Sequence, residues 1–124
     1  MHSTSGKWIL TTDRVFTLHL TITQWDILSR RWKQRKHVQN ISLLVADEAQ
    51  LVGSGEVGPV YEVVISRTRY VSAQTDNKTR IVACSVPLAN ARDFGDWMGA
   101  NAHTIFNFMP RFVPKVVFCE HHLC

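Results

Sequence analysis

The chain has 124 residues, of which 45% are hydrophobic and 19% are charged, so it suits one globular domain and is too short for two. The formal net charge of +4 gives a mild bias toward polyanions such as RNA, and no apolar run is long enough to cross a bilayer. Three cysteines behind an N-terminus without an uninterrupted apolar segment predict reduced thiols in an intracellular protein.

The first 40 residues predict one strand and one basic helix. Over 15–22, β-forming residues alternate with Thr and His, which indicates a strand. Over 24–36, two tryptophans and a leucine recur at helical spacing, and basic residues fill most other positions: Arg30, Arg31, Lys33, Arg35 and Lys36. This helix either lies along an RNA backbone or presents a solvated face whose long side chains cover apolar surface.

Residues 41–46 form the predicted centre of the fold. These mostly apolar residues run without alternation, as expected for a strand buried on both faces, and Asp47 and Glu48 follow at once. Burying an unpaired carboxylate is costly, so we expect both acids just beyond the carboxyl end of the strand, where α/β sheets bind ligands. There the first carboxylate can hold hydrated Mg²⁺ on a nucleotide and the second can orient water. The alternative is two solvated acids in an ordinary turn.

The second half of the chain predicts a glycine-rich loop, a helix, a short strand, a second helix and a final strand. Their expected ranges are 51–59, 60–73, 80–85, 89–98 and 105–108. Pro59 suits the first turn of the first helix, and Gly99 suits the stop of the second. On the first helix, the face expected to be buried carries Val60, Val63, Val64, Arg67 and Val71.

The alternation of strands and helices predicts an α/β fold with a mainly parallel sheet, helices on both faces and right-handed crossovers. Such crossovers would bring Asp47 and Glu48, after one strand, to the same edge as Ser85, which ends the next. This arrangement is expected of the nucleotide-hydrolysing lobe of a RecA-like motor.

Four segments, taken together, are more specific than any isolated motif: Asp47-Glu48-Ala49-Gln50, 25–36, 58–67 and 88–97. They resemble the Ski-type DExH-box RNA helicases, and within that family the large two-cassette type of the spliceosome. The resemblance implies that 23–114 form part of the first RecA-like lobe of a second cassette, with motifs Ib, II and III. Segments 1–22, with one possible strand, and 115–124 are expected to be divergent ends.

The resemblance also implies roles for single residues. Asp47 would hold the Mg²⁺ of ATP through water, and Glu48 would activate the attacking water. Gln50 would link the nucleotide to the partner lobe, and Ser85 would open motif III, which couples hydrolysis to RNA movement. The RNA-facing residues of motif Ib would be Thr23 and Trp25. The implied setting is nuclear, with RNA, spliceosomal proteins and the rest of a helicase cassette as partners and no membrane.

The sequence departs from the family pattern in three places. It contains no Gly-rich phosphate loop, no Pro-Glu follows Thr23, and motif III reads Ser85-Val86-Pro87 where the family has Ser-Ala-Thr. We therefore expect no ATP hydrolysis by this chain alone. Three interpretations stay open: a partial ATP-binding lobe of a splicing helicase, a degenerate lobe that docks proteins or RNA, or a truncated product without independent function.

Cysteines and histidines suggest two further sites that we do not assign. Four potential zinc ligands lie in the last six residues, but adjacent histidines rarely bind one ion and their spacing fits no common zinc finger. Cys84 lies within an apolar strand, where a thiol is usually an inert small hydrophobe.

Overall fold

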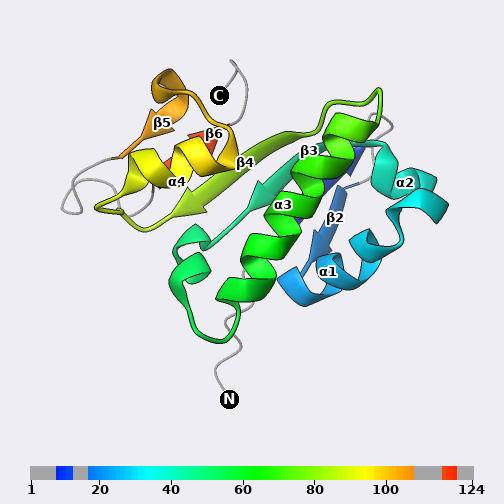
Figure 1. The fold of residues 1–124 in the computed structure, drawn as a ribbon, viewed down its shortest axis with the longest axis horizontal. Coiled ribbons are helices and arrows are strands. Elements are labelled where there is room, and N and C mark those ends of the chain that lie inside the picture. Colours follow the sequence, from blue (N-terminus) through cyan, green and yellow to red (C-terminus); the bar gives the residue numbers. More distant parts are fainter. Residues whose placement is uncertain (1–7, 13–16, 108–115, 120–124) are drawn as a thin grey trace.

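The computed structural model describes residues 8–12, 17–107 and 116–119, which form a six-stranded sheet with helices packed along it (Figure 1). The strands are β1 (Trp8–Thr12), β2 (Thr17–Leu20), β3 (Ile41–Ala46), β4 (Arg80–Ser85), β5 (Ile105–Phe106) and β6 (Val116–Cys119). The helices are α1 (Ile22–Arg30), α2 (Lys36–Gln39), α3 (Gly58–Gln74) and α4 (Ala91–Met98), with 3₁₀ turns η1 (Trp32–Gln34), η2 (Ala49–Gly53) and η3 (Ala102–Thr104). Among these residues, none of the helices has the length and apolar character needed to span a membrane.

The strand order is β2-β1-β3-β4-β6-β5, and most neighbours are antiparallel. In the described sheet only β3 and β4 pair in parallel, with Val45 opposite Val82. The prediction of a mainly parallel sheet is therefore wrong. Parallel neighbours need a long crossover, which α3 supplies between β3 and β4. β1 and β2 follow each other too closely in the chain for one, so they pair antiparallel.

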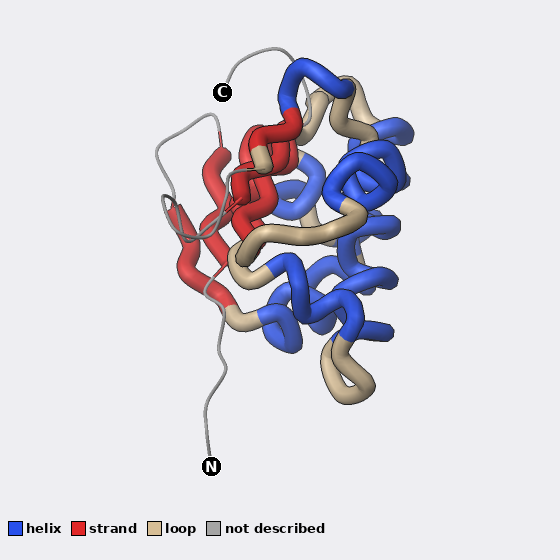
Figure 2. The backbone as a smooth tube through the Cα atoms, turned by 90° about the vertical axis from the view of Figure 1, so that its left-hand side faces the viewer, coloured by secondary structure: helices blue, strands red, loops and turns tan. Residues whose placement is uncertain are grey.

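The described helices lie along one face of the sheet (Figure 2), so the prediction of helices on both faces is also wrong for these residues. On β4, Ile81, Ala83 and Ser85 are buried, and the alternate residues are only partly buried. Leu44 and Ala46 of β3 are likewise fully buried while their neighbours keep some exposure. Side chains of a strand point alternately to opposite faces, so the helices cover one set and leave the other accessible.

The predicted strands 41–46 and 80–85 are confirmed at both ends. The strand expected over 15–22 ends at Leu20, and its first two residues lie outside the described residues. It ends there because Thr21 caps α1: Thr21 Oγ1 accepts the Gln24 N–H at 3.2 Å, and Gln24 Oε1 accepts the Thr21 N–H at 2.9 Å. This reciprocal capping box stabilises a helix start. The strand β1 was not predicted, and residues 120–124 of the expected tail lie outside the described residues.

The basic helix expected over 24–36 is broken into α1, η1 and α2. The break is held by Gln39, whose Nε2 donates to the carbonyls of Trp32 at 2.9 Å and Lys33 at 3.2 Å. A side chain thus satisfies two carbonyl groups that a continuous helix would bond to its own backbone.

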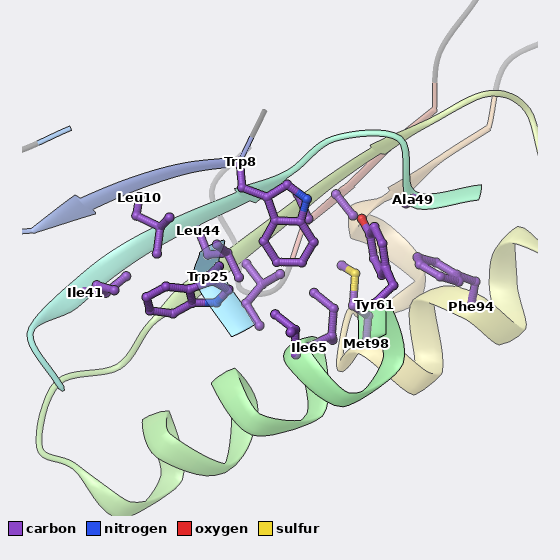
Figure 3. Close-up of a cluster of buried hydrophobic side chains, with 14 of the residues drawn as sticks. Trp8, Leu10, Trp25, Ile41, Leu44, Ala49, Tyr61, Ile65, Phe94 and Met98 are labelled. Carbon is purple, nitrogen blue, oxygen red and sulfur yellow. The ribbon is translucent and has the colours of Figure 1, made fainter. Parts of the chain in front are cut away.

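The helix α3 buries a face rotated from the predicted one. Its buried side chains are Tyr61, Val64, Ile65, Thr68 and Val71, while Val63 is 50% exposed. Trp8 of β1 packs edge-on against Tyr61, with ring centroids 5.1 Å apart (Figure 3). Pro59 lies in the first turn and Gly99 (φ 92°) ends α4, as predicted. Valines surround α3, so the sequence pattern alone did not determine which face is buried.

Candidate functional site

The carboxyl ends of β3 and β4 meet at one edge of the sheet. Because the two strands are parallel neighbours, Ala46 lies opposite Ala83 and the residues after each strand leave on the same side. Asp47 and Glu48 follow β3 and are partly buried, whereas Ser85 at the end of β4 is 1% exposed. The prediction that these strand ends share an edge is confirmed.

Gln50 connects the two strand ends through its side-chain amide. Its Nε2 donates to the Glu48 carboxylate, and its Oε1 lies 3.2 Å from Ser85 Oγ and 3.4 Å from the N–H of Val86. Ser85 Oγ also lies 2.8 Å from the Val86 carbonyl, so its single proton can serve only one of these acceptors at a time. One amide therefore links the second acid of the Asp47–Glu48 pair to the hydroxyl that ends β4.

Glu48 has a left-handed backbone (φ 56°, ψ 46°) and is the one non-glycine residue with positive φ in the described part of the chain. Asp47 Oδ1 accepts its N–H at 2.9 Å, and its carbonyl accepts the N–H of Leu51 at 3.0 Å at the start of η2. This conformation costs an L-residue about 1–2 kcal/mol. Such strain occurs preferentially at functional sites, where the surrounding structure holds it.

The buried side chain of Tyr61 forms a hydrogen bond to this turn. The residue is 1% exposed, and its hydroxyl donates to the backbone carbonyl of Asp47 at 3.4 Å. Burial raises the pKa of the Tyr61 hydroxyl, and the nearby carboxylates of Asp47 and Glu48 add to that rise. Tyr61 therefore remains a neutral donor at physiological pH. Sequence reasoning missed its role, although its spacing from Ile65 is that of a buried helix face.

The oxygen donors at this edge fit hydrated Mg²⁺ carried by a nucleotide. Mg²⁺ is usually held by one or two carboxylates together with phosphates and waters, and Asp47 and Glu48 are both partly accessible. Across the described ranges, no three His, Cys, Asp or Glu side chains cluster in a way that could hold a metal ion. The phosphates of a nucleotide would therefore have to complete the ligand set.

The residues predicted to contact RNA differ in their exposure to solvent. Trp25 is 3% exposed in the core, and its Nε1 donates to Thr68 Oγ1 at 3.3 Å, so the predicted RNA contact of its ring is not compatible with this structure. Thr23 is exposed in the first turn of α1. Arg35 is partly buried, and the remaining predicted cations are exposed: Arg30, Arg31, Lys33 and Lys36.

An ion-pair network that sequence reasoning missed joins α1 to α3. Asp26 is 6% exposed, and its two carboxylate oxygens accept hydrogen bonds from Arg67 Nη1 at 2.8 Å and Arg30 Nη2 at 2.7 Å. Arg67 also donates to Ser29 Oγ at 2.9 Å. The hydrogen bond from Arg30 lowers the pKa of Asp26, burial opposes that shift, and Arg67 lowers the pKa further. The spacing of Asp26 and Arg30 is the one signal that pointed to part of this network.

Comparison with known proteins gives several relatives, although no protein-family model matches the chain. The chain is 57% identical over 94 residues to the DExH-box ATP-dependent RNA helicase DExH12 of Arabidopsis thaliana. It is 56% identical over 94 residues to the U5 small nuclear ribonucleoprotein 200 kDa helicase of Homo sapiens. Each alignment covers 76% of this chain and 4% of the relative. Over most of its length, the chain is therefore a relative of the DExH-box RNA helicases, among them the U5 helicase of the spliceosome.

Proposed function

We propose that the chain forms the nucleotide-facing edge of a RecA-like lobe in an ATP-dependent RNA helicase of pre-mRNA splicing. The observation that carries this proposal is the Gln50 amide between Glu48 and Ser85, at the carboxyl edge of a parallel strand pair. Ligands bind at this edge in open α/β sheets. The names of the relatives support ATP as the nucleotide, RNA and spliceosomal proteins as partners, and a nuclear location.

In this proposal each residue at the nucleotide edge has a separate role. Asp47 would hold Mg²⁺ through water, and Glu48 would accept a hydrogen bond from the attacking water and orient it. Gln50 and Asp47 hold Glu48 at its carboxylate and at its backbone N–H, so the side chain is pre-oriented. Ser85 contacts Gln50 and ends β4, so it would transmit a conformational change at the nucleotide edge to that strand. Bound MgATP would supply the phosphoryl group to be transferred.

The whole motor activity would need parts that this sequence does not show. A Gly-rich phosphate loop normally cradles the β- and γ-phosphates with its backbone N–H groups, and no such motif occurs in the 124 residues. We therefore propose weak nucleotide binding and no hydrolysis for this chain alone.

Titration with MgATP, followed by backbone amide NMR signals, tests the proposal. We expect saturable shifts at residues 47–50 and 85–86, and we expect Asp47→Ala to weaken binding about tenfold or more, as loss of a charged contact worth about 1.4 kcal/mol would. Asp93→Ala is the matched control, since Asp93 is an exposed acid on α4. If Asp47→Ala binds MgATP as tightly as the native chain, or if ATP causes the same NMR shifts without Mg²⁺, the proposed role of Asp47 is contradicted.

A degenerate lobe that docks a protein is the second candidate function. It is favoured by the face of the sheet away from the helices, where Leu43, Val45 and Val82 are apolar and only partly buried. This candidate predicts that spliceosomal proteins are recovered with the chain from nuclear extract and that charged substitutions at Val45 or Val82 abolish their recovery.

A further inference from the structure

A group of basic and aromatic side chains lies at the opposite end of β3 from the nucleotide edge. α1, η1 and α2 precede β3 in the chain, whereas Asp47 follows it, so the two sites are at different ends of the strand (Figure 1). The proposed roles at the nucleotide edge use none of these side chains. We call the group the aromatic–basic patch, and its members are Arg31, Trp32, Lys33, Lys36 and Tyr70.

The aromatic part of the patch comes from two separate elements. Trp32 of η1 and Tyr70 of α3 meet edge to face, with ring centroids 6.2 Å apart and planes at 78°. Trp32 is partly buried against the core, whereas Tyr70 is 56% exposed. Tyr70 therefore packs against an anchored indole while the residue as a whole stays largely accessible to solvent.

One of the basic side chains, Lys33, lies close to these rings. Lys33 Nζ lies 5.8 Å from the centroid of the Trp32 ring, within the range of a cation–π contact. The Gln39 amide binds the carbonyls of Trp32 and Lys33, which fixes the turn that presents both side chains. Order in this turn lowers the conformational entropy that a ligand would otherwise have to remove on binding.

The exposed cations of the patch form no ion pair with the described acids. Arg31, Lys33 and Lys36 are exposed and form no ion pair within the described residues. Arg30 differs from them, because its guanidinium is engaged by Asp26 at 2.7 Å. Three exposed cations within six consecutive residues, without carboxylate partners among the described residues, attract a polyanion.

We infer that the aromatic–basic patch binds single-stranded RNA, with an unpaired base stacked on Tyr70 and phosphates contacted by Arg31, Lys33 and Lys36. Proteins that bind single strands combine an aromatic stacking surface with basic groups that follow the backbone. The bases of an RNA duplex stack on one another, so a duplex would contact the patch only through its phosphates and the basic side chains. An acidic peptide would also use the cations and gain little from the ring. The inference deepens the RNA partnership of the proposed function and is independent of the nucleotide edge.

Fluorescence anisotropy with a labelled oligouridine and a labelled RNA duplex tests the patch. We expect Tyr70→Ala to weaken binding of the single strand roughly fivefold or more, whereas Tyr70→Phe keeps it because the ring remains. Duplex binding should be nearly unchanged by either variant. The double variant Lys33→Gln and Lys36→Gln should weaken binding of both RNAs and reduce the dependence of affinity on salt.

Val63→Ala is the matched control, since Val63 is 50% exposed on the same helix and outside the patch. Equal loss of affinity in Tyr70→Ala and Val63→Ala, or competition by polyglutamate as strong as by RNA, would overturn the stacking role. Asp47→Ala separates the two proposals: loss of MgATP binding with unchanged RNA binding supports a distinct RNA patch, whereas loss of both contradicts it. Circular dichroism melts of each variant show that the fold is kept.

Discussion

Replacing Asp26 by alanine is expected to lower the free energy of unfolding by roughly 3–5 kcal/mol, the cost of leaving one partner of a buried ion pair without its counter-charge. The Asp26 side chain is 9% exposed and that of Arg67 is 20% exposed, so water replaces little of the lost interaction. Ser29 also contacts the Arg67 guanidinium and would not neutralise it. Urea unfolding measures the change.

Arg30→Ala provides the comparison for this network. The Arg30 side chain is 64% exposed, so its ion pair with Asp26 is screened by solvent and its removal should lower stability far less than removal of Asp26. Losses of similar size in Asp26→Ala and Arg30→Ala would show that the buried pair with Arg67 does not hold α1 to α3.

The same network predicts how stability depends on pH. Since the pKa of Asp26 is lowered in the folded state from its ordinary value of 3.8, its contribution is fully present above that value. As the pH falls below 3.8 and through the lowered folded pKa, the carboxylate is protonated and the contribution disappears. The difference in melting temperature between the native chain and Asp26→Asn should therefore shrink in acid. A difference that stays constant from neutral to strongly acidic pH would contradict this linkage.

Replacing Trp8 by alanine is expected to destabilise the fold by roughly 3–5 kcal/mol, as is typical when a large buried aromatic side chain is removed. Trp8 is 1% exposed and packs against Tyr61, which in turn binds the carbonyl of Asp47. Chemical denaturation measures the loss, and NMR signals of residues 47–50 should report a loosened turn.

Leu18→Ala is the control for this prediction, because Leu18 lies in the adjacent strand β2 and is 42% exposed. Its removal should cost far less than that of Trp8. Equal effects of the two substitutions would mean that β1 contributes no more to the core than the strand at the edge of the sheet.

The parts of the fold that were predicted correctly are those with strong local signals. Uninterrupted apolar runs defined β3 and β4, and the acids after the first run marked its carboxyl end. β1 was missed because it has only five residues, three apolar followed by two threonines, and so short a segment shows no recognisable alternation. The strand directions were wrong because pairings such as β1 with β3 depend on residues far apart in the chain.

The candidate site was predictable to a similar extent. Asp47, Glu48 and Ser85 were found because strand ends can be located from sequence, and parallel pairing then places them together. Asp26 and Arg67 are 41 residues apart, and their contact depends on how α1 packs against α3. The burial of Trp25 depends on the same packing, so helical periodicity alone did not show that its ring is enclosed.

The left-handed backbone of Glu48 has a consequence for laboratory evolution. Glycine adopts this conformation without the steric penalty of a side chain, so a library sorted for heat resistance alone should become enriched in glycine at position 48. A library sorted for nucleotide-dependent function should keep the carboxylate there. Comparing the residues enriched at position 48 in the two libraries would separate the requirement of backbone stability from the requirement of nucleotide chemistry.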